Sequence, residues 1–333
     1  MTTSSRAYSA VGQRVALAAS LWVAASLIVA FATFWWQATE VGGLGQFHLP
    51  LLIPALGFAG ISFGLRILRW HFFLGATGAH PALRFSAYTQ LIGFSLTMTP
   101  GKIGELYKCF LIERRTGVPT GRTAPIVLFE KGMDAAAFAL LALGAALLLP
   151  IAGDSVGYSL RVLAVIAALL VGATVMLRAA PAHSIASALL RASQRVPLGK
   201  KLGRLASALL NGSADLLRGP VLARAAVLSL AARTCDGLAL TWSAWAIGID
   251  LPALGGVLAL NSAGALGGLS MLPGGIGVVE ASMSVILTGF GASAGAALAG
   301  TLAARLLTFW LWVAAGLALL IRAGLVSRLE EDA

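Results

Sequence analysis

Nine ionisable residues stand within long apolar stretches of the sequence: Lys102, Glu105, Glu130, Lys131, Asp134, Arg233, Asp236, Glu280 and Arg305. A charge at the centre of a membrane helix costs roughly 2.5–3.5 kcal/mol, so these side chains should pair with one another and face an internal cavity. Glu130 and Asp134 share one helix face, and Lys131 can reach Asp134 three residues away. Arg233 and Asp236 repeat the three-residue spacing. We interpret the set as a polar pathway; the alternative is a set of ion pairs that only stabilises the helix bundle.

One of these residues, Lys102, follows a predicted helix start at Thr99, Pro100 and Gly101. Threonine is a favoured N-cap and proline a favoured first residue of a helix, so a half-helix should begin there. Its free amides and the positive end of its dipole would lie beside Lys102, an arrangement that suits a phosphate. Glu105, one turn later, would tune Lys102 or carry a proton. The sequence therefore predicts an anion site at this break.

The same pattern returns later in the chain. The segment 96–104 (LTMTPGKIG) matches the segment 269–277 (LSMLPGGIG). In the second copy two glycines, Gly274 and Gly275, follow the proline, and the charge comes from Glu280 instead. The two breaks therefore share the proline–glycine pattern that interrupts a helix, but they differ in the charged residue that they carry.

Composition indicates the class of protein that must position these residues. Of the 333 residues, 58% are hydrophobic and 11% are charged, against about 25% charged in a soluble domain. Apolar stretches of membrane-spanning length recur along the chain, which excludes a soluble enzyme with a single anchor. We expect an all-α polytopic membrane protein, one domain over residues 1–333, with six full transmembrane helices: 15–38, 50–68, 123–149, 157–178, 221–247 and 295–321.

Two further apolar stretches, 86–115 and 254–290, are each too long for one straight span. The two proline–glycine segments interrupt them near the middle. Such a break within a bilayer is tolerated only inside protein or beside a water-filled cavity. We therefore interpret both stretches as re-entrant helical hairpins.

The distribution of basic residues predicts the orientation in the membrane. The net charge is +11. The basic residues gather before the first span, at the end of the second and after it (Arg66 and Arg69 among them), between 178 and 224, and after the last span. By the positive-inside rule, both termini lie on the cytoplasmic side of a bacterial-type inner membrane. The loop 179–220 should form an amphipathic helix at the cytoplasmic interface. Since the membrane explains the positive charge, we do not expect nucleic-acid binding.

The two copies of the motif fall in predicted repeats of opposite orientation. The first repeat covers 50–149 and the second covers 221–322. Three full spans separate equivalent positions, so the two hairpins should enter from opposite sides of the membrane. On the repeat register Lys131 falls opposite Arg305. Inverted repeats with broken helices and a site near the midplane are typical of secondary transporters.

Four motifs carry a resemblance to a known family. They lie at 99–105 (TPGKIGE), 114–117 (RRTG), 130–134 (EKGMD) and 272–280 (LPGGIGVVE). In this order they resemble the flippase-like transmembrane region of lysylphosphatidylglycerol synthases, and the likeness covers nearly the whole chain. The resemblance implies a membrane domain that moves a phospholipid, or another lipid-linked anion, between leaflets, with Arg114 among its binding residues.

Two positions depart from the pattern of that family. Lys102 and Lys131 stand where the motifs lead us to expect arginine. Lysine keeps the positive charge but loses bidentate phosphate recognition, so the identity of the headgroup stays open. Larger relatives add a cytoplasmic aminoacyl-transfer domain. We expect none within the residues up to Ala333, and therefore no synthase activity.

We therefore predict a lipid translocase that is not an enzyme, needs no cofactor or metal, and has an anionic membrane lipid as its partner. One alternative is a membrane enzyme that acts on a lipid phosphate, but the sequence shows no nucleophile–base pair and no metal-ligand cluster. Another is an accessory subunit bound to envelope-biosynthesis enzymes, which would need no buried charges. The identity of the lipid, the coupling ion and a homo-oligomeric state stay open.

Overall fold

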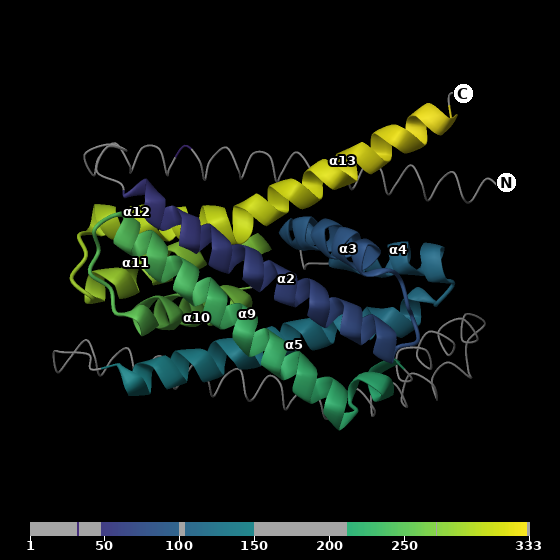
Figure 1. Ribbon diagram of the computed structural model, residues 1–333, viewed down its shortest axis with the longest axis horizontal. Coiled ribbons are helices and arrows are strands. Elements are labelled where there is room, and N and C mark those ends of the chain that lie inside the picture. Colours follow the sequence, from purple (N-terminus) through teal and green to yellow (C-terminus); the bar gives the residue numbers. More distant parts are fainter. Residues whose placement is uncertain (1–31, 33–47, 100–103, 150–211, 271, 332–333) are drawn as a thin grey trace.

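The computed structural model describes residue 32 and residues 48–99, 104–149, 212–270 and 272–331, which form helices joined by short loops (Figure 1). In chain order the helices described are η2 (Leu49–Leu51), α2 (Leu52–Ala76), α3 (Leu83–Ser95), η3 (Leu96–Met98), α4 (Tyr107–Thr116), α5 (Thr120–Leu148), α9 (Gly219–Ala246), α10 (Ala253–Leu269), η5 (Pro273–Gly275), α11 (Val278–Gly289), α12 (Ala294–Arg305), η6 (Leu306–Trp310) and α13 (Leu311–Glu331). These residues contain no strand, so the predicted all-α class is confirmed for them.

Several predictions fall on other residues and lie outside the described part of the chain. These are the spans 15–38 and 157–178 and most of the loop 179–220. The same holds for Pro100, Gly101 and Lys102 at the first break. The described chain resumes at Gly104, directly before Glu105.

Two of the predicted spans, 123–149 and 221–247, closely match α5 and α9. α2 differs, because it continues to Ala76 although the span was expected to end at residue 68. This corrects the expected place of Arg66 and Arg69 in a cytoplasmic connection, since both side chains are buried within the helix. The helix can continue because carboxylates on α5 and α9 neutralise the two arginines.

The last predicted span is a helix in three parts. α12 ends at Arg305, the π-helical turn η6 follows, and α13 continues to Glu331. Single π-turns inside helices frequently occur at functional sites. α13 leaves the bundle toward the C-terminus (Figure 1). Within the described ranges, two helical stretches are long and apolar enough to cross a membrane, Leu49–Ala76 and Ala294–Arg322.

Each proline–glycine segment separates two shorter helices. The first lies between η3 and α4, and the second, η5, lies between α10 and α11. The two breaks contact each other, since η3 packs against η5 and a Cβ added to Gly274 would lie 2.8 Å from Met98 Sδ. Gly274 has a φ of +62°, which glycine adopts without the strain that a side chain would cause. Two segments that are far apart in the sequence therefore meet inside the fold.

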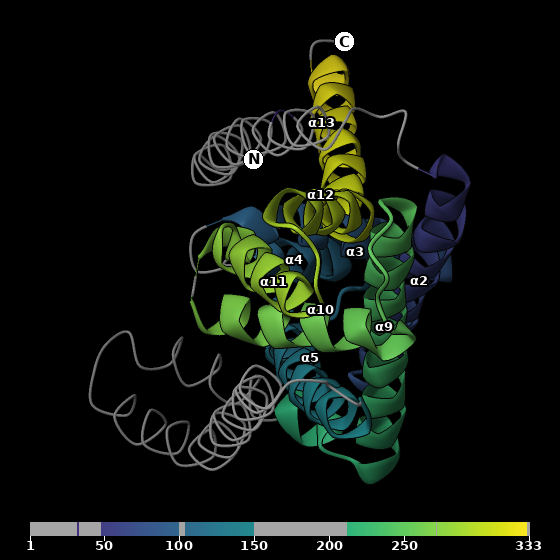
Figure 2. The same cartoon turned by 90° about the vertical axis from the view of Figure 1, so that its left-hand side faces the viewer.

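The helices α2 and α9 pack along each other in opposite directions (Figure 2). At one end the His48 N–H donates to the Ala246 carbonyl at 2.8 Å. Farther along, Arg69 donates to the Ser229 hydroxyl at 2.6 Å. Around this pair, α3 packs against α13 and α10 packs against α5. Each half of the chain thus lays a short helix on a long helix of the other half.

Candidate functional site

A continuous chain of ion pairs joins α2, α5 and α9 inside the bundle. Arg66 pairs with Asp236, whose second partner is Arg233 at 3.3 Å. Arg233 Nη2 lies 2.6 Å from Asp134 Oδ2, and Asp134 Oδ1 lies 2.6 Å from Arg69 Nη1. None of these five side chains is more than 12% exposed. The structure therefore brings together Asp134, Arg233 and Asp236, which the sequence placed on two separate helices.

The chain of ion pairs continues from α5 into α4 through Glu130. Arg69 Nη2 lies 3.7 Å from Glu130 Oε1, and Lys108 Nζ pairs with Glu130 Oε2. Lys108 also donates to Gln90 Oε1 at 2.9 Å and stands 4.0 Å from the centre of the Trp70 ring, a cation–π contact. Only 2% of Lys108 is exposed. We call Arg66, Arg69, Lys108, Glu130, Asp134, Arg233 and Asp236 the ionic network.

Sequence analysis missed three members of the ionic network: Arg66, Arg69 and Lys108. The two arginines follow an apolar stretch and therefore resemble the basic residues of a loop. Lys108 precedes the basic end of α4, so it resembles an interfacial charge. Helical spacing is the signal that could have found the arginines. Arg66 lies four residues after Ser62, which it contacts at 3.4 Å, and three before Arg69, so all three share one polar helix face.

The ionic network carries more positive than negative charge. It contains four cations and three carboxylates. In addition, two donors, Arg69 Nε and Arg233 Nε, and one acceptor, Glu130 Oε1, have no hydrogen-bond partner within the part of the chain that the structure describes. A buried donor without a partner is costly. An anion would neutralise the excess charge and could accept from these donors, so the arrangement favours an anionic ligand.

Lys131 pairs with Glu105, which corrects the expected contact between Lys131 and Asp134. Lys131 Nζ lies 2.7 Å from Glu105 Oε1, and the same oxygen accepts from the Thr97 hydroxyl at 2.9 Å. The physical reason is that both oxygens of Asp134 are already held by the arginines of α2 and α9. Glu105 therefore has a partner on α5.

Thr99 hydrogen-bonds to backbone on both sides of the first break. Its hydroxyl donates to the Leu96 carbonyl at 2.7 Å and accepts from the Gly104 N–H at 2.9 Å. Gly104 lies five residues after Thr99, not the two or three of an N-cap, and α4 begins after Leu106 without a side-chain cap. Thr99 is the C-cap of η3 and not the N-cap of α4.

Glu280 and Arg305 form the corresponding pair at the second break. Arg305 Nε lies 2.7 Å from Glu280 Oε1, and Arg305 Nη2 donates to the Gly274 carbonyl at 3.0 Å. Glu280 Oε2 accepts from the Gly277 N–H at 2.8 Å at the start of α11. Gly275 is buried beside this contact, with a φ of +67°. In each half of the chain, a carboxylate after the break thus pairs with a cation on the next long helix.

Comparison with known proteins gives the family. The family described as lysylphosphatidylglycerol synthase TM region matches residues 15–316. The chain belongs to this family. The resemblance drawn from the four sequence motifs is therefore confirmed. None of the curated proteins compared with the chain matches it.

As a member of the lysylphosphatidylglycerol synthase transmembrane-region family, the chain is a membrane protein related to lipid modification or transport. Its exposed surface agrees with this placement. Large apolar side chains such as Ile53, Leu128 and Leu148 are about three-quarters exposed, at 73%, 70% and 73%. In a membrane these side chains face lipid, so their exposure to the surroundings is favourable.

Not every charged residue of this family member joins the ionic network. Arg114 is exposed in the last turn of α4, where its guanidinium lies 5.4 Å from the centre of the Phe110 ring. Asp215 pairs with Arg122 at 2.9 Å and with Arg218 at 2.8 Å, near the surface. Across the described ranges, no group of His, Cys, Asp or Glu side chains could hold a metal ion.

Proposed function

We propose that this protein moves an anionic lipid between the leaflets of the cytoplasmic membrane and that the ionic network holds the headgroup as it crosses. The excess positive charge of the network carries the proposal, together with the unpartnered Nε groups of Arg69 and Arg233. A phosphate within the hydrocarbon layer would be prohibitively costly without compensating charge. The network offers such charge at a buried place. No chemical step and no cofactor belong to the proposal.

The proposal includes two inverted repeats, 50–149 and 221–322, with re-entrant hairpins, six full spans and cytoplasmic termini. Three observations support it: α2 and α9 are antiparallel, the two breaks are in contact, and the carboxylate–cation pairs after the breaks take matching places. In transporters of this architecture, one repeat rocks against the other around a central site.

The variant Arg233→Gln tests the role of the ionic network. It removes one positive charge but leaves each carboxylate a partner, because Asp134 keeps Arg69 and Asp236 keeps Arg66. Reconstituted in liposomes, it should move fluorescent phosphatidylglycerol at least about tenfold more slowly, since a hydrogen bond to a charged group is worth roughly 1.5–3 kcal/mol. Arg233→Lys, which keeps the charge, should retain part of the activity.

Arg224→Gln is the matched control on the same helix. Arg224 is exposed, and the same positive charge is lost, so this variant should move the lipid at the unmodified rate. Chemical reduction of the fluorophore on the outer leaflet gives the rates. If folded Arg233→Gln matches the unmodified protein, the network is not the headgroup site. If the unmodified protein moves no lipid, the transport function itself is wrong.

A further inference from the structure

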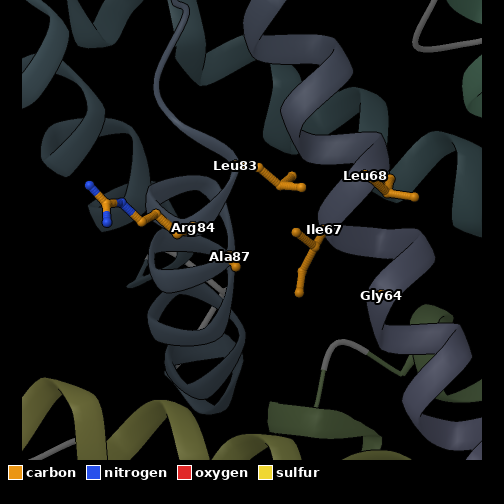
Figure 3. A pocket seen from close by; sticks show the side chains of 6 residues that line it. All are labelled: Gly64, Ile67, Leu68, Leu83, Arg84 and Ala87. Carbon is orange, nitrogen blue, oxygen red and sulfur yellow. The ribbon is translucent and has the colours of Figure 1, made fainter.

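A groove of 480 Å³ runs between the outer sides of α2 and α3. Its walls are Gly64, Ile67 and Leu68 of α2 and Leu83, Arg84 and Ala87 of α3 (Figure 3). The groove is shallow and open along its outer side, unlike the enclosed clefts that bury most of a small ligand. Apart from Arg84 the lining is apolar. A groove of this kind on a membrane protein faces hydrocarbon chains.

Gly64 creates part of the space in this groove. A Cβ added at Gly64 would meet no atom within 4 Å, so the absence of a side chain leaves the wall open. Ile67 and Leu68 follow three and four residues later and therefore lie on the same face of α2. Ile67 and Leu83 project into the space between the two helices (Figure 3). The groove therefore exists because α2 and α3 stand apart here and because Gly64 has no side chain to fill the space between them.

Arg84 places a positive charge at the border of the apolar groove. It is exposed in the first turn of α3, and it forms no ion pair or hydrogen bond in the described part of the chain. Its stem borders the groove, whereas its guanidinium points away from the groove, to the other side of α3 (Figure 3). To hold a phosphate at the groove, Arg84 must change rotamer, which exposed side chains do within picoseconds to nanoseconds. An apolar groove beside an unpaired arginine matches a ligand with a hydrocarbon chain and a phosphate.

The groove lies on the outer side of the seam between α2 and α3. Inside the seam, the Trp70 indole N–H donates to the Thr89 hydroxyl at 3.1 Å, and His71 Nδ1 lies 2.9 Å from Ser86 Oγ. Lys108 of the ionic network lies directly against the same Trp70 ring. Two hydrogen-bonded contacts and one ring therefore separate the groove from the network.

We propose that the α2–α3 groove binds one acyl chain of an anionic glycerophospholipid whose phosphate is held by Arg84. The proposal deepens the proposed function, on which it rests for the later passage of the lipid, by naming the substrate class and the place where the lipid is taken from the membrane. A lipid in this groove stands at the seam that leads to the ionic network. Its negative headgroup would neutralise the excess positive charge of the ionic network.

Photo-crosslinking tests the groove with the full chain in lipid nanodiscs. The probes are phosphatidylglycerol and phosphatidylcholine that carry a diazirine on one acyl chain, and mass spectrometry of peptides locates the adducts. Adducts should concentrate on residues 64–68 and 83–87. Phosphatidylglycerol should label these segments about fivefold more than phosphatidylcholine, the ratio expected for one cation at a membrane surface.

Gly64→Leu fills the groove and should remove most adducts of both lipids from these segments. Gly57→Leu is its control on the same helix, because Gly57 is exposed and a Cβ there also meets nothing within 4 Å. Both substitutions favour the helix, since leucine is a better helix former than glycine. Arg84→Gln should equalise the two lipids, whereas Arg224→Gln should leave the preference intact. Equal labelling of Gly64→Leu and Gly57→Leu would mean that the adducts are surrounding lipid only, which overturns the proposal.

Lipid translocation in liposomes of the same proteins separates this proposal from the proposed function. Specific labelling of the groove without any translocation keeps the groove as a lipid site and rejects transport. Translocation of phosphatidylglycerol without specific labelling keeps transport and rejects the groove. Slower translocation by Gly64→Leu than by Gly57→Leu would support both.

Discussion

The Asp134 carboxylate lies 2.6 Å from the Arg69 guanidinium, so α5 and α2 are joined by a buried ion pair. The other oxygen of Asp134 holds Arg233 of α9 at the same distance, which makes one aspartate the link between three helices. Asp215 likewise pairs with two arginines, but near the surface. The two aspartates are almost equally buried, but the arginines around Asp134 are buried and those around Asp215 are exposed. The comparison therefore isolates the burial of the cations.

Asp134→Asn should destabilise the protein by roughly 3–5 kcal/mol, because it leaves two buried arginines without their shared anion. Asp215→Asn removes the same charge from a similar pair of arginines and should change stability by at most about 1 kcal/mol, because water screens the exposed pairs. Thermal or denaturant unfolding in detergent measures both variants. If Asp134→Asn lowered the stability as little as Asp215→Asn, the buried ion pairs would not stabilise the bundle.

The two carboxylate–cation pairs after the breaks should differ in their effect on stability. Arg305 is 9% exposed and holds both Glu280 and the Gly274 carbonyl, so Arg305→Gln should destabilise by roughly 3–5 kcal/mol. Lys131 is 34% exposed, and its partner Glu105 keeps a second hydrogen bond. Lys131→Gln should therefore cost less, about 1–3 kcal/mol.

Arg305→Lys provides the control for this comparison. Lysine keeps the positive charge, but it lacks the fork that lets Arg305 contact Glu280 and the Gly274 carbonyl together. The unfolding midpoint of Arg305→Lys in detergent should therefore lie between those of Arg305→Gln and the unmodified protein. A Lys131→Gln variant as unstable as Arg305→Gln would contradict the expected order.

Gly316 of α13 sits where the helix touches α3. A Cβ at this position would fall against the Leu91 carbonyl, closer than real Cβ contacts come. Gly316→Ala should therefore destabilise by about 1–3 kcal/mol through overpacking. Gly132→Ala in α5 is the control, because a Cβ there meets nothing within 4 Å, and alanine should be neutral or stabilise by up to about 1 kcal/mol. Melting curves of the two alanine variants that coincide would rule out the close approach of α13 and α3.

The two ends of α9 should lie on opposite sides of the membrane. Arg218 precedes its start, Asp250 follows its end, and both are exposed. In a variant without Cys109 and Cys235, a cysteine at 250 should react with an impermeant maleimide in intact cells. A cysteine at 218 should react only after permeabilisation. The reverse pattern would overturn the assignment of the basic connections to the cytoplasm.

Local features of the sequence were enough to predict the helical class, the two interruptions and the family. The length of an apolar stretch reports a membrane helix wherever it folds. Proline and glycine interrupt a helix through their own backbone properties. The contact between Arg233 and Asp236 could also be expected, because both stand on one helix at a spacing of three. These features depend on residues that are neighbours in the chain.

Partners between helices depended on the tertiary structure. Lys131 contacts Glu105 instead of Asp134, and Arg66 and Arg69 lie inside the bundle instead of in a loop. Which charges meet depends on how each helix is rotated and how closely small residues let it approach its neighbour. A buried charge pairs with whichever opposite charge this packing brings within reach, since it has no water to solvate it. Packing of α2, α4, α5 and α9 therefore decided the membership of the ionic network and its excess of positive charge.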